Sequence, residues 1–185
     1  DGDGRADEYL TASTGWGVSG AYHEYAYGPV FDAEGNIYTS LNCSMGKVWK
    51  GAGDEAQHPL WRGWVVRTTP QGKLEPWCAG FRSPCGIGTN FEGDIFISDQ
   101  QGNWMPTTPI FHAKKGAYFS HADSIPDAMR PDSPVKINAK QPDGITVAEA
   151  MKTVPGYCPP AVWLPYVKMG QSGTGIVCDR SGGKF

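Results

Sequence analysis

The sequence predicts an all-β protein of the β-propeller type, and three observations support this prediction. The 185 residues include 25 Gly, 15 Pro and 12% aromatic residues, a composition typical of short strands joined by tight turns. A strand–turn–strand unit occurs twice, and its first half occurs again near the C-terminus. The interval between the first two copies has room for two hairpins, as in a four-stranded propeller blade. A β-sandwich is the alternative, but it does not predict such a repeat.

The repeated unit covers residues 28–42 (GPVFDAEGNIYTSLN) and residues 86–100 (GIGTNFEGDIFISDQ). Each copy reads as a strand, a turn with an Asx residue and a Gly, and a strand that alternates apolar and polar residues. Because the Asx side chain can bond the turn backbone and Gly supplies a positive φ, each copy predicts a hairpin. A third, partial copy begins at Gly175 and places Asp179 and Gly182 at the equivalent turn.

The remaining chain supplies further strands and one insertion. Residues 63–80 predict another hairpin around a turn at residues 70–73, and a Pro-rich insertion at residues 128–160 contains one short helix at residues 145–153. We therefore expect residues 1–185 to form one partial propeller domain of about three blades, truncated at both ends. Such a piece would expose strand edges if made alone.

Charge and motifs exclude several classes of function. The net charge is −3 without a basic block, which argues against a nucleic-acid partner, and no run of 18 apolar residues predicts a membrane span. Common hydrolase and nucleotide-binding motifs are absent. The five cysteines show no CxxC spacing and are interpreted as small buried hydrophobic residues. No His or Cys residues occur at zinc-ligand spacing, so a zinc site is not expected.

Two polar residues precede the inner strands of the two copies and are candidate site residues, because such positions converge at one face of a propeller. His23 lies five residues before Gly28, and Arg82 lies four residues before Gly86. His23 is either satisfied by local backbone bonds or a general base, since imidazole titrates near neutral pH.

Arg82 also has two interpretations. It pairs with a carboxylate such as Glu75 or Asp99, or its planar fork clamps an anion or a carbonyl group. Asn42 and Gln100, at the polar ends of the strands that follow, are expected to face the same region.

The N-terminal segment DGDGRAD is a candidate structural calcium loop. Asp1, Asp3 and Asp7 alternate around Gly4, and carboxylates around a turning Gly suit a hard cation. The alternative is a polar surface turn.

Three segments, taken in order, resemble the soluble quinoprotein glucose/sorbosone dehydrogenases. HEYAYGPVFDAEGNIYTSLN resembles the family segment in which a histidine precedes a strand–turn–strand unit. GFRSPCGIGTNFEGDIFISDQQG resembles a segment with a conserved arginine and a later glutamine, and PAVWLPYVKMGQSGTGIVCDRSGGKF resembles a later region. The sequence of these segments is most similar to the branch of this family that is often fused to a haem-binding cytochrome domain.

This resemblance implies a six-bladed propeller that binds pyrroloquinoline quinone (PQQ) and calcium and oxidises a sugar or related alcohol by hydride transfer to the quinone. It implies that His23 is the general base and that Arg82 contacts the quinone. Gln100 matches a glutamine beside the cofactor, and the backbone carbonyls of Gln101 and Gly102 match calcium ligands.

The resemblance also carries departures and expectations about location. Ser83 stands where the family has a cofactor-contacting asparagine, and Cys85 stands where it has a glutamine. A periplasmic or secreted protein with a sugar or alcohol substrate and a cytochrome c electron acceptor is implied.

Two other functions stay open. The first is a propeller without cofactor that serves as a binding module in a multidomain protein. The second is a lactonase-like metal-dependent hydrolase, which needs an Asn/Asp/Glu cage; Asn42, Asn90 and Asp99 offer fragments of one.

Overall fold

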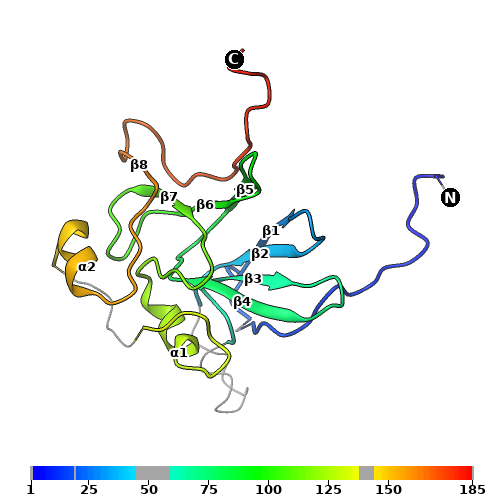
Figure 1. The fold of residues 1–185 in the computed structure, drawn as a ribbon, viewed down its shortest axis with the longest axis horizontal. Helices are drawn as coiled ribbons and strands as arrows, with labels where there is room; N and C mark the ends of the chain where they lie inside the picture. The colour runs from blue at the N-terminus through cyan, green and yellow to red at the C-terminus, as the bar shows by residue number, and fades with distance from the viewer. Residues whose placement is uncertain (1, 19, 45–58, 138–143, 185) are drawn as a thin grey trace.

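Two four-stranded antiparallel sheets form the body of the molecule, in a computed structural model that describes residues 2–18, 20–44, 59–137 and 144–184. The strands of the first sheet are β1 (Ala26–Phe31), β2 (Ile37–Leu41), β3 (Trp64–Thr68) and β4 (Leu74–Ala79). Those of the second are β5 (Gly86–Thr89), β6 (Ile95–Ser98), β7 (Thr108–His112) and β8 (Val162–Leu164). Within each sheet the strands pair in chain order, and β1 contacts β5 of the neighbouring sheet (Figure 1).

The turns of the first two repeat copies have the bonds that the sequence predicts. Asp32 Oδ1 accepts the Asn36 backbone N–H at 2.8 Å, and Asn90 Oδ1 accepts the Asp94 backbone N–H at 2.8 Å. The Gly residues of the two turns have φ values of 80° and 86°. The amide and carboxylate have exchanged positions between the copies, yet each pair keeps a side-chain hydrogen bond, at 2.8 Å and 3.1 Å.

The second predicted hairpin and the predicted helix are also present. β3 pairs with β4 around a turn where Gly72 has a φ of 80°. The helix α2 covers Val147–Thr153 and begins later than residue 145 because Thr146 caps it. The Thr146 hydroxyl accepts the Glu149 N–H, while the Glu149 carboxylate accepts the Thr146 N–H, which forms a capping box.

The other helical segments are short, so the fold is mostly β. η2 covers Ala122–Ser124, and α1 covers Ile125–Ala128. In the part of the chain that the structure describes, no helix has the length and apolar character needed to cross a membrane.

Strand β3 of the first sheet is buried on both of its faces. Val65 packs in a core that includes Ile97 and Phe111 of the second sheet. Trp64 and Val66 point the other way, into a second core that includes residues of the Pro-rich insertion such as Val135. The insertion therefore covers the face of the first sheet that is turned away from the second.

The third repeat copy does not form a third sheet, which corrects the expectation of about three blades. Its turn is present, since Asp179 Oδ1 accepts the Ser181 N–H at 2.7 Å and Gly182 has a φ of 72°. Its first segment lies against β5, where a Cβ added at Gly88 would be 2.5 Å from the Ile176 carbonyl oxygen. The counterpart of β2 would begin only at Lys184, so this segment has no partner strand within the described residues. The described part of the chain forms two sheets, and these do not close a ring.

A short stretch after β7 joins the two sheets. The Ala79 N–H donates to the Ala117 carbonyl at 3.0 Å, and the Phe119 N–H donates to the Ala79 carbonyl at 2.9 Å. Residues 117–119 therefore cover the edge of β4 and lead directly to His121, which caps η2.

Candidate functional site

A polar cluster lies where β2 and β6 end, at the opposite end of the strands from the repeated turns. Asp99 directly follows β6 and is 3% exposed. Its carboxylate accepts the backbone N–H groups of Arg82 at 2.8 Å, Ser83 at 2.6 Å and Gln100 at 2.8 Å. Burial raises the pKa of Asp99 to about 6, although the three N–H donors and the nearby Arg82 charge act in the opposite direction.

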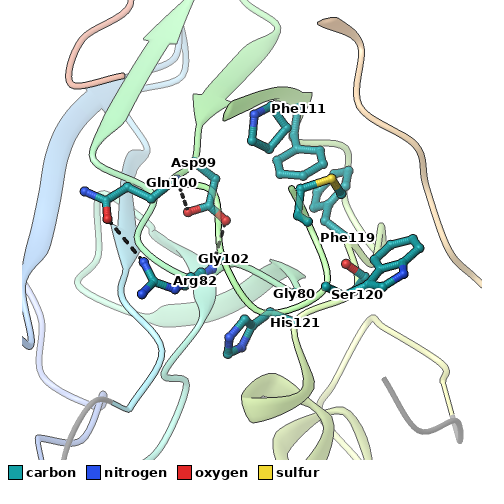
Figure 2. Close-up of a pocket in the computed structure, with 12 residues that line it drawn as sticks. Gly80, Arg82, Asp99, Gln100, Gly102, Phe111, Phe119, Ser120 and His121 are labelled. Atoms are coloured by element: carbon teal, nitrogen blue, oxygen red, sulfur yellow. Dashed lines mark hydrogen bonds between the residues drawn. The ribbon is translucent and has the colours of Figure 1, made fainter. Parts of the chain in front are cut away.

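The Arg82 guanidinium lies beside this carboxylate but bonds a neutral amide. Its Nη1 donates to Gln100 Oε1 at 3.2 Å, as Figure 2 shows. Gly102 makes room for it, because a Cβ at residue 102 would be 2.6 Å from Arg82 Nε. Asp99 binds the Arg82 backbone, and Glu75 instead forms ion pairs with Arg67 and Lys73. The expected carboxylate partners are therefore not partners of the guanidinium.

Arg82 and Gln100 line a small cavity (Figure 2). Its volume is about 10 Å³, the space of about one water molecule. His121 lines the same cavity, and burial lowers the pKa of its imidazole; the Asp123 charge opposes this shift, and the Arg82 charge adds to it. Aromatic side chains close the other side.

Buried side-chain hydrogen bonds connect the two inner-strand loops. Asn42 Nδ2 donates to Ser83 Oγ at 2.7 Å, and Asn42 Oδ1 accepts the Tyr25 N–H at 3.3 Å. Ser40 Oγ donates to the Pro84 carbonyl at 2.8 Å. Ser83, a predicted cofactor contact, thus lies inside this network, with its N–H on Asp99 and its hydroxyl on Asn42.

The structure does not bring His23 into the Arg82 cavity. The His23 side chain is exposed, and its ring centroid lies 3.9 Å from that of Tyr22. Its neighbour Glu24 accepts a hydrogen bond from Ser44 Oγ at 3.2 Å. Burial lowers the pKa of Arg62, and the nearby Glu24 charge opposes this shift.

The predicted calcium ligands are placed as follows. The Gly102 carbonyl accepts the Met105 N–H at 3.2 Å, and the Gln101 side-chain oxygen accepts two hydroxyl donors at 3.4 Å each. Asp3 and Asp7 are exposed, and Asp3 Oδ1 accepts the Arg5 N–H at 2.8 Å. Asp1 lies outside the described residues.

The fragments of a hydrolase cage do not come together. Asn90 bonds Asp94 in the turn that joins β5 to β6, whereas Asp99 follows the far end of β6. Asn42 is committed to Ser83. This observation argues against a lactonase-like cage built from these three residues.

Sequence spacing missed one group of side chains. Cys43, His121 and Asp123 each offer a ligand atom, and these atoms lie within 4.8 Å of one another. Burial raises the pKa of the Cys43 thiol to about 12, with Asp123 and Asp99 adding to the effect. The ligands come from the end of β2 and from the cap of η2, so no sequence pattern signals them.

The prediction that the five cysteines are small buried hydrophobic residues holds for two of them. Cys43 and Cys78 are buried, whereas Cys85, Cys158 and Cys178 are half-buried, and no disulfide joins the five.

Comparisons with known proteins give structural neighbours only. The sequence matches no described protein family, and no curated protein is significantly similar to it. The soluble aldose sugar dehydrogenase of Escherichia coli in its apo form aligns with a TM-score of 0.44 and 18% identity, over 73% of this chain and 38% of that one. A glucose dehydrogenase aligns with a TM-score of 0.44 and 18% identity, over 74% of this chain and 37% of that one.

A second glucose dehydrogenase gives a TM-score of 0.43 and 16% identity, over 74% of this chain and 38% of that one. The chain therefore spans little more than a third of the length of the structures it matches.

Proposed function

We propose that this chain is part of a propeller-type oxidoreductase that oxidises a sugar or related alcohol with PQQ as cofactor. The observation that carries the proposal is the Arg82–Gln100 pair. The half-buried Arg82 guanidinium is hydrogen-bonded to the Gln100 amide. This pair lies at the end where β2 and β6 finish, where the repeat brings the inner-strand loops together. The sequence resemblance supplies the cofactor and the substrate class.

The donor chemistry of this pair fits PQQ, which presents carbonyl and carboxylate oxygens. The guanidinium has five N–H donors, and its one hydrogen bond to a described residue goes to Gln100 Oε1. The cavity is too small for a three-ring molecule, so the cofactor would bind on the solvent side of Arg82. Gln101 and Gly102 follow directly in the chain and would offer carbonyl oxygens to calcium.

The residues of this chain would then have separate roles. Bound PQQ would supply the acceptor for the substrate hydride. Arg82 would donate hydrogen bonds to the cofactor oxygens and stabilise negative charge there, while Gln100 fixes the guanidinium plane. His23 would take the proton of the substrate hydroxyl, and its exposed ring is accessible to a substrate.

The test is sugar-dependent dye reduction by the complete protein that carries this chain, with PQQ and calcium added. His23→Gln is expected to lower kcat by about 10²–10⁴-fold, because a general base contributes that much. His112→Gln is the matched control, since that histidine pairs with Asp94 on the second sheet.

Two outcomes would contradict the proposal. Turnover that His23→Gln leaves unchanged would remove His23 as the base. Complete lack of turnover with every sugar and alcohol tested, in protein shown to bind no PQQ, would favour a binding module without cofactor.

A further inference from the structure

Three side chains that usually bind transition metals meet beside the Arg82 cavity. The Cys43 thiol, the His121 imidazole and the Asp123 carboxylate have ligand atoms within 4.8 Å of one another. In a tetrahedral zinc site with bonds of about 2.0–2.3 Å, ligand atoms lie about 3.3–3.8 Å apart. A movement of about 1 Å or less would therefore bring the three side chains onto one ion.

The imidazole has a polar atom that nothing in the described chain satisfies. His121 is 7% exposed, and its Nε2 is buried without a hydrogen-bond partner. Its Nδ1 accepts the Asp123 N–H at 3.4 Å, a long bond that fixes the tautomer only weakly. A buried unpaired polar atom is costly. A cation bound at Nε2, in the tautomer that carries its proton on Nδ1 and gives up the long Asp123 bond, would remove the cost.

The backbone around the three residues is built to bring them together. Gly80 lets the 119–121 backbone approach closely, because a Cβ there would be 2.5 Å from the Phe119 nitrogen. Ser120, next to His121, has a φ of 95°, a conformation that a residue with a side chain rarely adopts. The Cys43 N–H donates to the Arg82 carbonyl at 2.9 Å, which anchors the third ligand. Such strain is often found where side chains are held for function.

We propose that Cys43, His121 and Asp123 form a binding site for one divalent transition-metal ion, with zinc as the best match. Sulfur, imidazole nitrogen and carboxylate oxygen are the zinc ligands of proteins, whereas calcium and magnesium prefer oxygen alone. A thiolate and a carboxylate balance the two charges of the ion. Three protein ligands leave one coordination position for water or another group.

This site is independent of the proposed PQQ chemistry. It uses none of the residues to which the oxidoreductase proposal gives a role, although His121 shares a cavity with Arg82. Metal binding can therefore be tested by spectroscopy whatever the enzyme activity is.

The experiment is a titration of the reduced, chelator-treated complete protein with Co²⁺ alone, followed by Zn²⁺. We expect one Co²⁺ per chain, with the visible bands of a four-coordinate ion and a near-ultraviolet thiolate-to-cobalt charge-transfer band, and we expect Zn²⁺ to displace it. Cys43→Ser should abolish the charge-transfer band and weaken Zn²⁺ binding by more than about 100-fold, since loss of a supporting partner alone costs 10–100-fold. Cys178→Ser, which removes a half-buried thiol outside the group, should leave both unchanged.

A second variant protects the test against misfolding of Cys43→Ser. Asp123→Asn changes a half-buried side chain and keeps the backbone bonds of η2, so near-ultraviolet circular dichroism should show a native fold. It should still weaken Zn²⁺ binding by at least about 10-fold. The proposal is wrong if the unmodified protein binds no Co²⁺ or Zn²⁺ at micromolar concentration. It is also wrong if the cobalt spectrum lacks the thiolate band, or if the band persists in Cys43→Ser.

Discussion

The two sheets repeat one strand–turn–strand unit. At one end of the unit the residues differ but their hydrogen bond is kept, and at the other end an apolar residue is replaced by a carboxylate. At the turn end, Asp32 and Asn36 of the first sheet become Asn90 and Asp94 in the second, yet the hydrogen bond between the side chains is kept. At the other end, the position equivalent to the last residue of β2 has changed its chemistry. Leu41 is fully buried in the first sheet, and the equivalent Asp99 is buried in the second.

This difference separates what builds the sheet from what builds the site. The turn tolerates exchanged residues because each copy still pairs one amide donor with one carboxylate acceptor, although Asp32 also accepts the Tyr38 hydroxyl and the equivalent Phe96 offers none. A buried carboxylate in place of a leucine needs donors, and the Arg82–Ser83 backbone supplies two of them. The Arg82 loop is therefore shaped by a residue that the first sheet lacks.

The largest expected effect comes from making the second sheet like the first at this position. Asp99→Leu would leave three backbone N–H donors without their acceptor, each worth about 1–3 kcal/mol when buried. We expect the free energy of unfolding to fall by about 3 kcal/mol or more, measured by urea denaturation. Asp99→Asn keeps one acceptor oxygen and should lose less, and equal losses in the two variants would contradict this explanation.

The pH dependence of stability should identify the same carboxylate. The pKa of Asp99 is about 6 in the folded protein, against an ordinary value of 3.8 for an aspartate, so between these values the folded state binds more protons than the unfolded state. Stability from this group is complete below about pH 4 and is lost as the pH rises through 6, by up to about 3 kcal/mol. The difference in unfolding free energy between the natural protein and Asp99→Asn should decrease over this window. A flat difference would contradict the raised pKa.

The turn exchange predicts a smaller effect that a second substitution reverses. Asp32→Asn places an amide against the Asn36 amide and should cost about 1 kcal/mol of unfolding free energy. Adding Asn36→Asp recreates the arrangement of the second sheet and should restore stability to within about 0.5 kcal/mol. Thermal and urea denaturation measure both, and simple additivity of the two losses would refute the exchange.

The smallest effect on global stability concerns the third repeat copy. Gly88→Ala would place a Cβ 2.5 Å from the Ile176 carbonyl oxygen and should release the segment around Ile176 from β5. Hydrogen exchange by mass spectrometry should show faster exchange in that segment, by about 10-fold. Gly175→Ala is the control, because a Cβ there meets nothing within 4 Å. Unchanged exchange in Gly88→Ala would mean that the segment does not depend on this contact.

The repeat made most of the fold predictable from the sequence. The turn residues and the alternating strands are local signals that predict the three hairpins. The short helix also has a local signal, because Thr146 and Glu149 form its capping box. The expected third blade is not seen among the described residues, where the third copy has a turn and a first segment but no partner strand. The packing of Val135 against the outer face of the first sheet has no local signal, because it depends on how a long insertion folds back.

The site was predictable only where the repeat fixed its position. Arg82 and Gln100 stand at fixed offsets from the second copy, and the structure joins them by a hydrogen bond. The meeting of Cys43 with His121 depends on close backbone approaches at glycines and on the unusual φ of Ser120, which are tertiary features.

The most direct test of the proposed function is a calorimetric titration of the complete protein with PQQ in the presence of calcium. The natural protein should bind about one PQQ per chain, and Arg82→Gln should weaken binding by about 10-fold or more, because a charge-assisted hydrogen bond is lost. Arg67→Gln, whose arginine pairs with Glu75 on the first sheet, should bind like the natural protein. No binding, or equal binding by Arg82→Gln, would contradict the assignment of Arg82 to a quinone site.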